Sequence, residues 1–397
     1  MDFAPTALQE RWIGEARSFA DAHMRPQADR WDERGEFPLD CFREAAKLGF
    51  AGLFAPAEVG GQALDAVTAC LIYEALGRGC FATTFGMVVH NNFVRSLARA
   101  GTAAARERWL AAATRGELIG AFALTEPGAG SDAAAIETTA VRERGGFRLD
   151  GVKAWVSNGG TADLYTVMAR TAAPGRSRAI SSFVVERGSP GVSFGPPDRK
   201  IAAGALPTCR MTLRNVWVPE ENLLGAEGEG LRSALATIDV ARAVVAAMAT
   251  GIAAAALDEA VAYARSRRAF GRPIAEFQGL QFPLAEAAAK VEAARWLAYR
   301  AAWLCDRGLA AAEASAMAKL VAVETAEQVC SRAVDVFGAN GLLRDHPVER
   351  YYRWAKVAAF LDGTQQIQQV VITRRLFASP DAVPRSRPER PPADGQG

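Results

Sequence analysis

Lysine, histidine and paired cysteine are all scarce in this sequence. Only six of the 397 residues are lysines and only three are histidines, which excludes a histidine-rich metal site. The six cysteines are scattered singly and no Cys-x-x-Cys pair occurs, so their density is far below that of a disulfide-stabilised scaffold. We therefore expect reduced thiols in a cytoplasmic protein.

An excess of one charge and long apolar runs are missing as well. The 46 basic and 44 acidic residues leave a net charge of +2, so no basic excess exists to neutralise phosphates, which argues against a protein that binds nucleic acid or another polyanion. The first residues contain no apolar core of the kind that signal peptides have. The apolar uncharged run 243–257 is shorter than the ~18–20 residues of a membrane helix. We expect no membrane span.

The patterns that are present divide the chain into three parts. Residues 1–118 carry apolar side chains at helical spacing and predict an N-terminal α-helical domain. Residues 119–226 alternate β-prone and polar residues between short turns, which predicts a central antiparallel β-barrel or sheet domain. Residues 227–378 are Ala-rich and helical again, and small side chains favour a C-terminal four-helix bundle. The tail 379–397 is Pro-rich and predicted to be disordered. The predicted fold class is α+β, with several domains.

The strongest local signal is the segment FALTEPGAGSD at residues 122–132. Thr125 supplies a hydroxyl at a strand end, and Gly128 and Gly130 make a tight loop that a ligand can approach closely. Ser131 can cap the next element or donate to a ligand. A plain β-turn is the alternative interpretation of this segment taken alone.

A second segment, WVSNGG at residues 155–160, follows on the next predicted strand. Trp155 and Ser157 are two residues apart, so a regular strand places both on one face. A wide aromatic ring and a hydroxyl group on one face suit a flat heterocyclic ligand. An ordinary core tryptophan is the alternative interpretation.

These two segments, at their spacing, closely resemble the acyl-CoA dehydrogenase family. The resemblance covers residues 5–378 and continues through further motifs in the family's order: NLLG at 222–225, RRAFGRP at 267–273, EFQ at 276–278, GANG at 338–341 and DGTQQI at 362–367. It implies an FAD-containing oxidoreductase that acts on an acyl thioester of CoA or of an acyl carrier protein. It also implies a homo-oligomer, typically a tetramer, and an electron-transferring flavoprotein as the electron acceptor.

The resemblance assigns roles to individual positions. The flavin site would be formed by Phe122, Leu124, Thr125, Gly130, Ser131, Trp155, Ser157, Thr364 and Gln366. Arg267 and Phe270 would reach the FAD of a neighbouring subunit, with Gln278 nearby. Asp335 and Gly338 would lie against the dinucleotide. The acyl thioester would be contacted by Ser131, Asp239, Arg242, Gly363 and Arg374.

The implied reaction needs a base for the proton on the α-carbon of the thioester. In the family this base is usually a Glu directly before a Gly-Thr pair, and here that residue is Asp362. Some members carry the Glu elsewhere, at the position of Ala241, which is not a base. Asp362 is therefore the candidate catalytic residue, although it is one methylene shorter than Glu.

The shorter base leaves two other functions open. Nitroalkane oxidases resemble this family and use Asp here, but they rely on an Arg seven residues later, where this chain has Gln369. The second of these alternatives is a catalytically silent flavin-binding homologue. Retention of the flavin motifs favours an active dehydrogenase over the silent homologue.

One histidine has two interpretations. The resemblance places His90 on a helix that forms part of the acyl pocket wall, where it would contact a polar acyl group. The alternative is a structural histidine whose ring nitrogens are satisfied within the helix packing, and this alternative is favoured.

Overall fold

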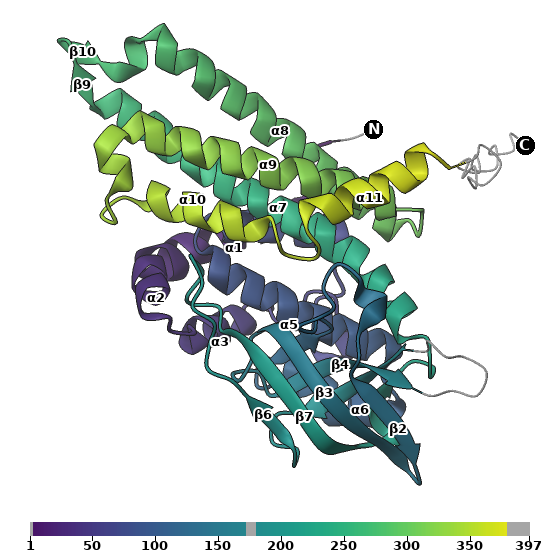
Figure 1. Cartoon of the computed structure of the whole chain (residues 1–397). Coiled ribbons are helices and arrows are strands. Elements are labelled where there is room, and N and C mark those ends of the chain that lie inside the picture. Colours follow the sequence, from purple (N-terminus) through teal and green to yellow (C-terminus); the bar gives the residue numbers. More distant parts are fainter. Residues whose placement is uncertain (1–2, 172–179, 379–397) are drawn as a thin grey trace, which may run out of the picture.

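In the computed structural model, residues 3–171 and 180–378 are described (Figure 1). The N-terminal part is helical, as predicted, and its helices are α1 (Ala7–Phe19), α2 (Ala28–Arg34), α3 (Leu39–Lys47), α4 (Ala66–Gly77), α5 (Phe81–Ala100) and α6 (Ala103–Thr114). Thr6 starts α1 with a capping box that Gln9 completes. Asp65 and Thr102 cap α4 and α6 through their side-chain oxygens.

The central part is one sheet of eight strands. Their bounds are β1 (Gly120–Ala123), β2 (Thr139–Glu143), β3 (Gly146–Ser157), β4 (Leu164–Thr171), β5 (Ile180–Glu186), β6 (Val192–Phe194), β7 (Thr208–Pro219) and β8 (Leu223–Leu224). The order β6-β7-β3-β2-β4-β5-β8, with β1 beside β4, is an open path, so among the described residues the sheet is not closed into a barrel.

The sheet also differs from the prediction in strand direction. Most pairs are antiparallel, but β4 pairs in parallel with both β1 and β2. The predicted sheet is confirmed, but its strand pairing is mixed and not antiparallel throughout. Local alternation of apolar and polar residues predicts strands but contains no information on the direction in which distant strands meet.

The C-terminal part is a helical bundle built on three long helices. Its elements are α7 (Gly230–Ser266), α8 (Gln278–Asp306), α9 (Ala312–Phe337), α10 (Pro347–Ala358) and α11 (Gln365–Leu376). Fully buried alanines such as Ala298 on α8 and Ala322 on α9 allow the close helix approach that the composition predicted. A two-stranded hairpin, β9 (Arg268–Ala269) and β10 (Arg272–Pro273), extends from one end of the bundle (Figure 1).

Helix α7 is the centre of this bundle. By length and composition it is the one helix among the described residues that could cross a membrane, yet 94% of its most apolar stretch is buried inside the protein. It packs against α4, α8 and α9. Burial of this kind is what the core helix of a globular protein has.

The N-terminal helices connect the sheet to the bundle. Helix α5 packs against both β1 of the sheet and α7 of the bundle. Arg350 and Arg353 of α10 form ion pairs with Asp29 and Asp32 of the α2 helix. The turn between α10 and α11 lies on the side of the bundle that faces the sheet (Figure 1). All six cysteines are unpaired, as expected for reduced thiols, and the Pro-rich tail 379–397 lies outside the described residues.

Candidate active site

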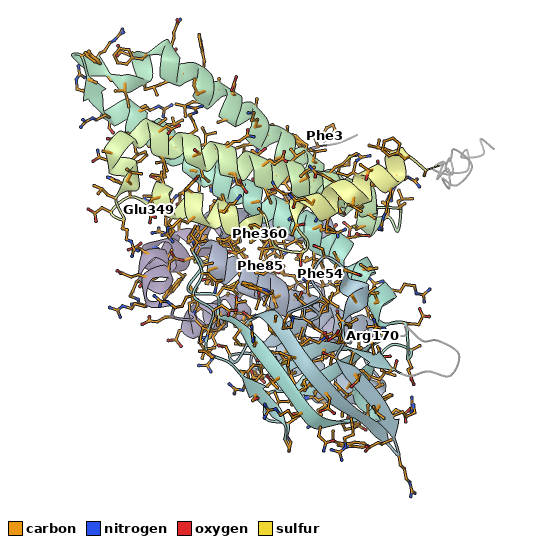
Figure 2. All side chains as sticks on the ribbon, viewed as in Figure 1. Phe3, Phe54, Phe85, Arg170, Glu349 and Phe360 are labelled. Atoms are coloured by element: carbon orange, nitrogen blue, oxygen red, sulfur yellow. The ribbon has the colours of Figure 1, made fainter. Side chains whose placement is uncertain are left out.

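The turn between α10 and α11 holds the candidate base. Helix α11 begins after Thr364, whose hydroxyl oxygen accepts a hydrogen bond from the backbone of Ile367 at 3.3 Å. Two consecutive residues before this cap have left-handed backbones, Asp362 with φ 48° and Gly363 with φ 99°. Glycine adopts such angles freely, and Asp adopts them more readily than most other residues. In Figure 2, the neighbouring Phe360 lies at the edge of the bundle nearest to Phe85 of α5.

The carboxylate of Asp362 has one buried oxygen without a partner, although the residue as a whole is half-buried. Its Oδ2 atom has no solvent contact and no hydrogen-bond partner among the described residues. Burial raises the pKa of this carboxyl group, while the positive charges of Lys319 and then Arg242 oppose the rise. An unpaired, desolvated carboxylate oxygen is suited to accept a proton from a ligand.

Two of the predicted thioester contacts lie directly beside this turn, both on α7. The Nε atom of Arg242 donates to the backbone oxygen of Asp362 at 3.3 Å. A guanidinium nitrogen of Arg242 lies 3.6 Å from a carboxylate oxygen of Asp239. A Cβ atom added at Gly363 would lie 3.7 Å from the same guanidinium, so the structure brings Asp239, Arg242, Asp362 and Gly363 together.

Lys319 of α9 completes this cluster. The sequence motifs did not predict it. Its side chain is fully buried, and its ammonium donates to the backbone oxygens of Ala359 at 2.7 Å and Gly363 at 2.6 Å. Burial lowers the pKa of Lys319 to about 8. The one available signal was a lysine inside the apolar helical run Ala-Met-Ala-Lys-Leu-Val.

The loop after β1 carries the first motif and is fixed by a buried ion pair. Lys153 of β3 donates to Glu126 at 2.6 Å and to the backbone oxygen of Leu124 at 3.1 Å. The Glu126 carboxylate also accepts from the backbone of residue 138 at 3.0 Å. The backbone of Ala154 donates to the oxygen of Thr125 at 2.8 Å, which joins the loop to β3. This ion pair was also missed by the sequence interpretation.

The same loop is open where the predicted glycines lie. A Cβ atom added at Gly128 or Gly130 would meet no other atom within 4 Å. Ser131 is exposed, while Phe122 is partly exposed. The loop therefore leaves room for a ligand at its surface.

Trp155 has an unusual backbone and an unusual exposure. Its φ is 55° and 64% of the residue is exposed to solvent. The register between β3 and β7 shifts between Lys153 and Val156, so Trp155 sits in a β-bulge rather than in the regular strand that was predicted. Ser157, at the end of β3, is partly exposed. A large exposed ring on a strained backbone, beside an open glycine loop, provides a flat surface of the kind that a planar cofactor needs.

A second group of predicted cofactor residues lies elsewhere. Five of them are exposed near the end of the bundle that carries the β9–β10 hairpin: Arg267, Phe270, Gln278, Asp335 and Gly338. Phe270 is 94% exposed and its backbone is left-handed, with φ 50°. This end of the bundle points away from the sheet (Figure 1). One chain therefore does not bring these residues to Trp155.

Three further predicted site residues lie on α11 or at its start. Gln366 is exposed on the first turn of α11, directly after the base turn. Arg374 is exposed in the last turn of α11, two helical turns beyond Gln366. Thr364 uses its hydroxyl oxygen as the cap of α11, which leaves its O–H free to donate.

His90 is removed from the candidate substrate contacts. The ring is fully buried, its Nδ1 accepts from the backbone of Gly120 at 3.0 Å, and its Nε2 lies 3.0 and 3.1 Å from the oxygens of Ala51 and Ala113. This pattern requires a neutral ring with the proton on Nε2. Both ring nitrogens are occupied by backbone groups, so His90 acts as a structural histidine.

Three family models together match most of the chain. Acyl-CoA dehydrogenase, N-terminal domain, matches residues 6–117; the middle domain matches 121–216; and the C-terminal domain matches 228–377. An acyl-CoA dehydrogenase of Bacillus subtilis (strain 168) is 38% identical over 362 residues, covering 91% of this chain and 96% of the relative.

Two solved structures are similar over nearly the whole fold. Butyryl-CoA dehydrogenase from Megasphaera elsdenii has a TM-score of 0.92 at 33% identity, with 95% of this chain and 100% of that chain covered. The structure of PigA with FAD and proline has a TM-score of 0.91 at 28% identity, with 95% and 99% covered.

Proposed function

The chain belongs to the acyl-CoA dehydrogenase family, and we propose that Asp362 is the base with which it dehydrogenates an acyl thioester. The observation that carries this assignment is the buried Oδ2 atom of Asp362, which has no partner among the described residues. A carboxylate so placed can take a proton from carbon without first losing a hydrogen bond.

The substrate of such a reaction is an acyl chain with hydrogens on its α- and β-carbons. Asp362 takes the α-proton, and the electron pair of that C–H bond becomes the second bond between the α- and β-carbons. The β-hydrogen leaves as hydride, for which FAD, when bound, is the two-electron acceptor. Asp362 then holds one proton, so atoms and charges balance with an enoyl thioester as the product.

FAD is the cofactor, and the residues that are present fit it. Trp155 offers an exposed ring beside the open loop of Gly128 and Gly130, and the Thr364 hydroxyl can donate from the turn that also carries the base. We assign the flavin end to Phe122, Leu124, Thr125, Gly130, Ser131, Trp155, Ser157, Thr364 and Gln366.

The exposed residues at the hairpin end of the bundle support an oligomer. Arg267 is a permanent cation with several donors, which suits a pyrophosphate, and Phe270 is almost fully exposed. The β9–β10 hairpin beside which both residues lie is at the end of the bundle that points away from the sheet (Figure 1). We propose that this hairpin, with Gln278, Asp335 and Gly338, completes the FAD site of a neighbouring copy in a homotetramer.

Arg242 and Asp239 are proposed to hold the thioester beside the base turn, because both lie on the stretch of α7 that contacts it. Ser131, Gly363 and Arg374 remain proposed substrate contacts. CoA is the proposed carrier of the acyl group, and an acyl carrier protein is the alternative carrier. An electron-transferring flavoprotein is the proposed electron acceptor. The cytoplasmic location stays a prediction.

Anaerobic mixing with a series of acyl-CoA thioesters tests the function. We expect the purified protein to be yellow and its flavin absorbance to bleach within the mixing experiment, with slow return in air. Asp362→Asn should keep the FAD and lose the bleaching. Fast oxygen consumption with nitroalkanes would show an oxidase instead. A yellow protein inert to both substrate classes would show a silent homologue.

A further inference from the structure

Lys319 contacts the base turn and has hydrogen-bond partners before and after Asp362 in the chain. Its ammonium donates to the oxygen of Ala359, just after the end of α10, and to the oxygen of Gly363, directly after the base. These hydrogen bonds are 2.7 and 2.6 Å long, the shortest that the turn makes with other helices. A cation that bonds to a carbonyl group three residues before Asp362 and to another one residue after it restricts the movement of the turn that carries the base.

The pairing of Lys319 differs from that of the other fully buried lysine. Lys153 has a carboxylate partner, Glu126, at 2.6 Å. Among the described residues Lys319 has only carbonyl oxygens within hydrogen-bond distance, and no carboxylate within 4.0 Å. A fully buried ammonium without a paired anion is costly, so its place here needs a reason beyond packing.

The turn has a backbone conformation that requires such support. Asp362 is a non-glycine residue with φ 48°. Its backbone oxygen accepts hydrogen bonds from Arg242 of α7 at 3.3 Å and from Gln368 of α11 at 3.4 Å. Both hydrogen bonds are longer than those that Lys319 donates. Donors from α7, α9 and α11 thus hold one strained turn, and Lys319 makes the closest contacts.

The charge of Lys319 also acts on the carboxylate. Burial raises the pKa of Asp362, and Lys319 is the largest charge that opposes this rise, followed by Arg242. In return, burial lowers the pKa of Lys319, while Asp362 raises it and Arg242 lowers it. Arg242 from α7 and Asp362 from the turn are the charged groups that act on Lys319, and Asp239 of α7 acts on Arg242.

We propose that Lys319 is the positioning residue of the base: its ammonium holds one carbonyl group on each side of the base in the chain, that of Ala359 and that of Gly363, and favours the ionised carboxylate. The inference rests on the proposed function of Asp362. Lys319 touches neither substrate nor cofactor in this role, because its donors are directed to the backbone of the turn.

The pH profile of flavin reduction by an acyl-CoA tests the proposal in the full-length holoenzyme. Lys319 has a pKa of about 8 and loses its charge above that pH, so the wild-type rate should fall on the basic side near pH 8. Arg does not titrate in this range, so Lys319→Arg should remove the basic limb while its acid limb stays. A wild-type profile without a limb near pH 8, or a limb that persists in Lys319→Arg, would overturn the proposal.

A second variant separates positioning from folding. Lys319→Met removes the ammonium, and we expect flavin reduction to slow by about 100-fold, the cost of a misplaced base. FAD content should be retained, KM should change much less than kcat, and the acid limb should move to higher pH. Lys47→Met, which changes an exposed lysine on α3, is the matched control and should leave the rate and both limbs unchanged.

The outcomes also separate this inference from the proposed function. A Lys319→Met rate within twofold of the wild type, with an unshifted acid limb, contradicts the role of Lys319 while leaving Asp362→Asn to decide the base. If Asp362→Asn does not lower the rate of flavin reduction, the assignment of Asp362 as the base is contradicted. The inference about Lys319 is then contradicted as well.

Discussion

Arg242 donates from its Nε atom to the backbone oxygen of Asp362 at 3.3 Å, so a cation of the longest helix is bonded to the candidate base itself. The same guanidinium lies 3.6 Å from Asp239, one turn earlier on α7. The end of α7 that is proposed to bind the thioester is therefore hydrogen-bonded to the base turn. A change on α7 should affect proton transfer as well as binding.

Arg242→Ala tests this coupling. The variant removes a charged donor from the turn and a cation that favours the ionised carboxylate, so flavin reduction should slow by about tenfold or more, the value of one charged hydrogen bond. KM should rise as well if the side chain contacts the thioester. Stopped-flow reduction over a range of acyl-CoA concentrations separates the two effects. Arg232→Ala, an exposed arginine on the same helix, is the control, and an unchanged maximal rate in Arg242→Ala would refute the coupling.

Trp155→Gly separates cofactor binding from folding. Glycine adopts φ 55° without strain, and the tryptophan ring is 64% exposed, so the stability of the FAD-free protein should stay the same or rise. FAD affinity should fall, because the flat surface is lost. Thermal unfolding of the FAD-free protein and FAD titration give the two readouts. A large loss of stability with full FAD affinity would show that Trp155 is a packing residue.

The sequence predicted the order of helices, sheet and helices, and it located the open glycine loop, because both depend on local patterns. It missed Lys319, whose carbonyl partners are 40 and 44 residues away. It also missed the pair of Lys153 and Glu126, which are 27 residues apart. Contacts of this kind form only when separate helices and strands pack together. The parallel pairing of β1 with β4 was not predicted, for the same reason.

His90 shows the opposite case, in which a chemically suggestive residue has a structural role. Nothing in the local sequence distinguishes a ring that faces a ligand from one that bonds to backbone. Only the positions of Ala51, Ala113 and Gly120 around the ring decide it.

His90 should make stability depend on pH. Burial lowers its pKa to about 4 in the folded protein from 6.5. Between these values the unfolded chain binds the proton and the folded chain does not, so stability is lost as pH falls from 6.5 toward 4, by roughly 3 kcal/mol in all. Urea unfolding at fixed protein concentration measures this. His90→Gln should be less stable at pH 7 but show a flatter profile, and an equally steep profile would assign the dependence to other groups.

The buried pair of Lys153 and Glu126 should behave non-additively. Lys153→Met leaves Glu126 buried without its cation, which should cost about 3–5 kcal/mol of stability. Lys153→Met combined with Glu126→Gln removes both charges and should be less destabilising than Lys153→Met alone. Both variants should retain FAD less well, because the pair holds the Thr125 loop to β3. Additive effects in the double-mutant cycle would show that the two side chains are not coupled.

The choice of Asp rather than Glu at position 362 is decided by the backbone as well as by reach. With φ 48°, this position favours Asp, which adopts left-handed angles more readily than Glu does. The Oδ2 atom is already enclosed, so an added methylene must displace its surroundings or the substrate. We therefore expect Asp362→Glu to bind FAD normally but to be reduced more slowly by its best thioester, by up to about 100-fold. Asp362→Asn, which keeps the backbone preference, is the reference for complete loss of the base. If Asp362→Glu is instead faster than the wild type on straight-chain acyl-CoA, the site is a shortened version of a Glu site and was not built around Asp.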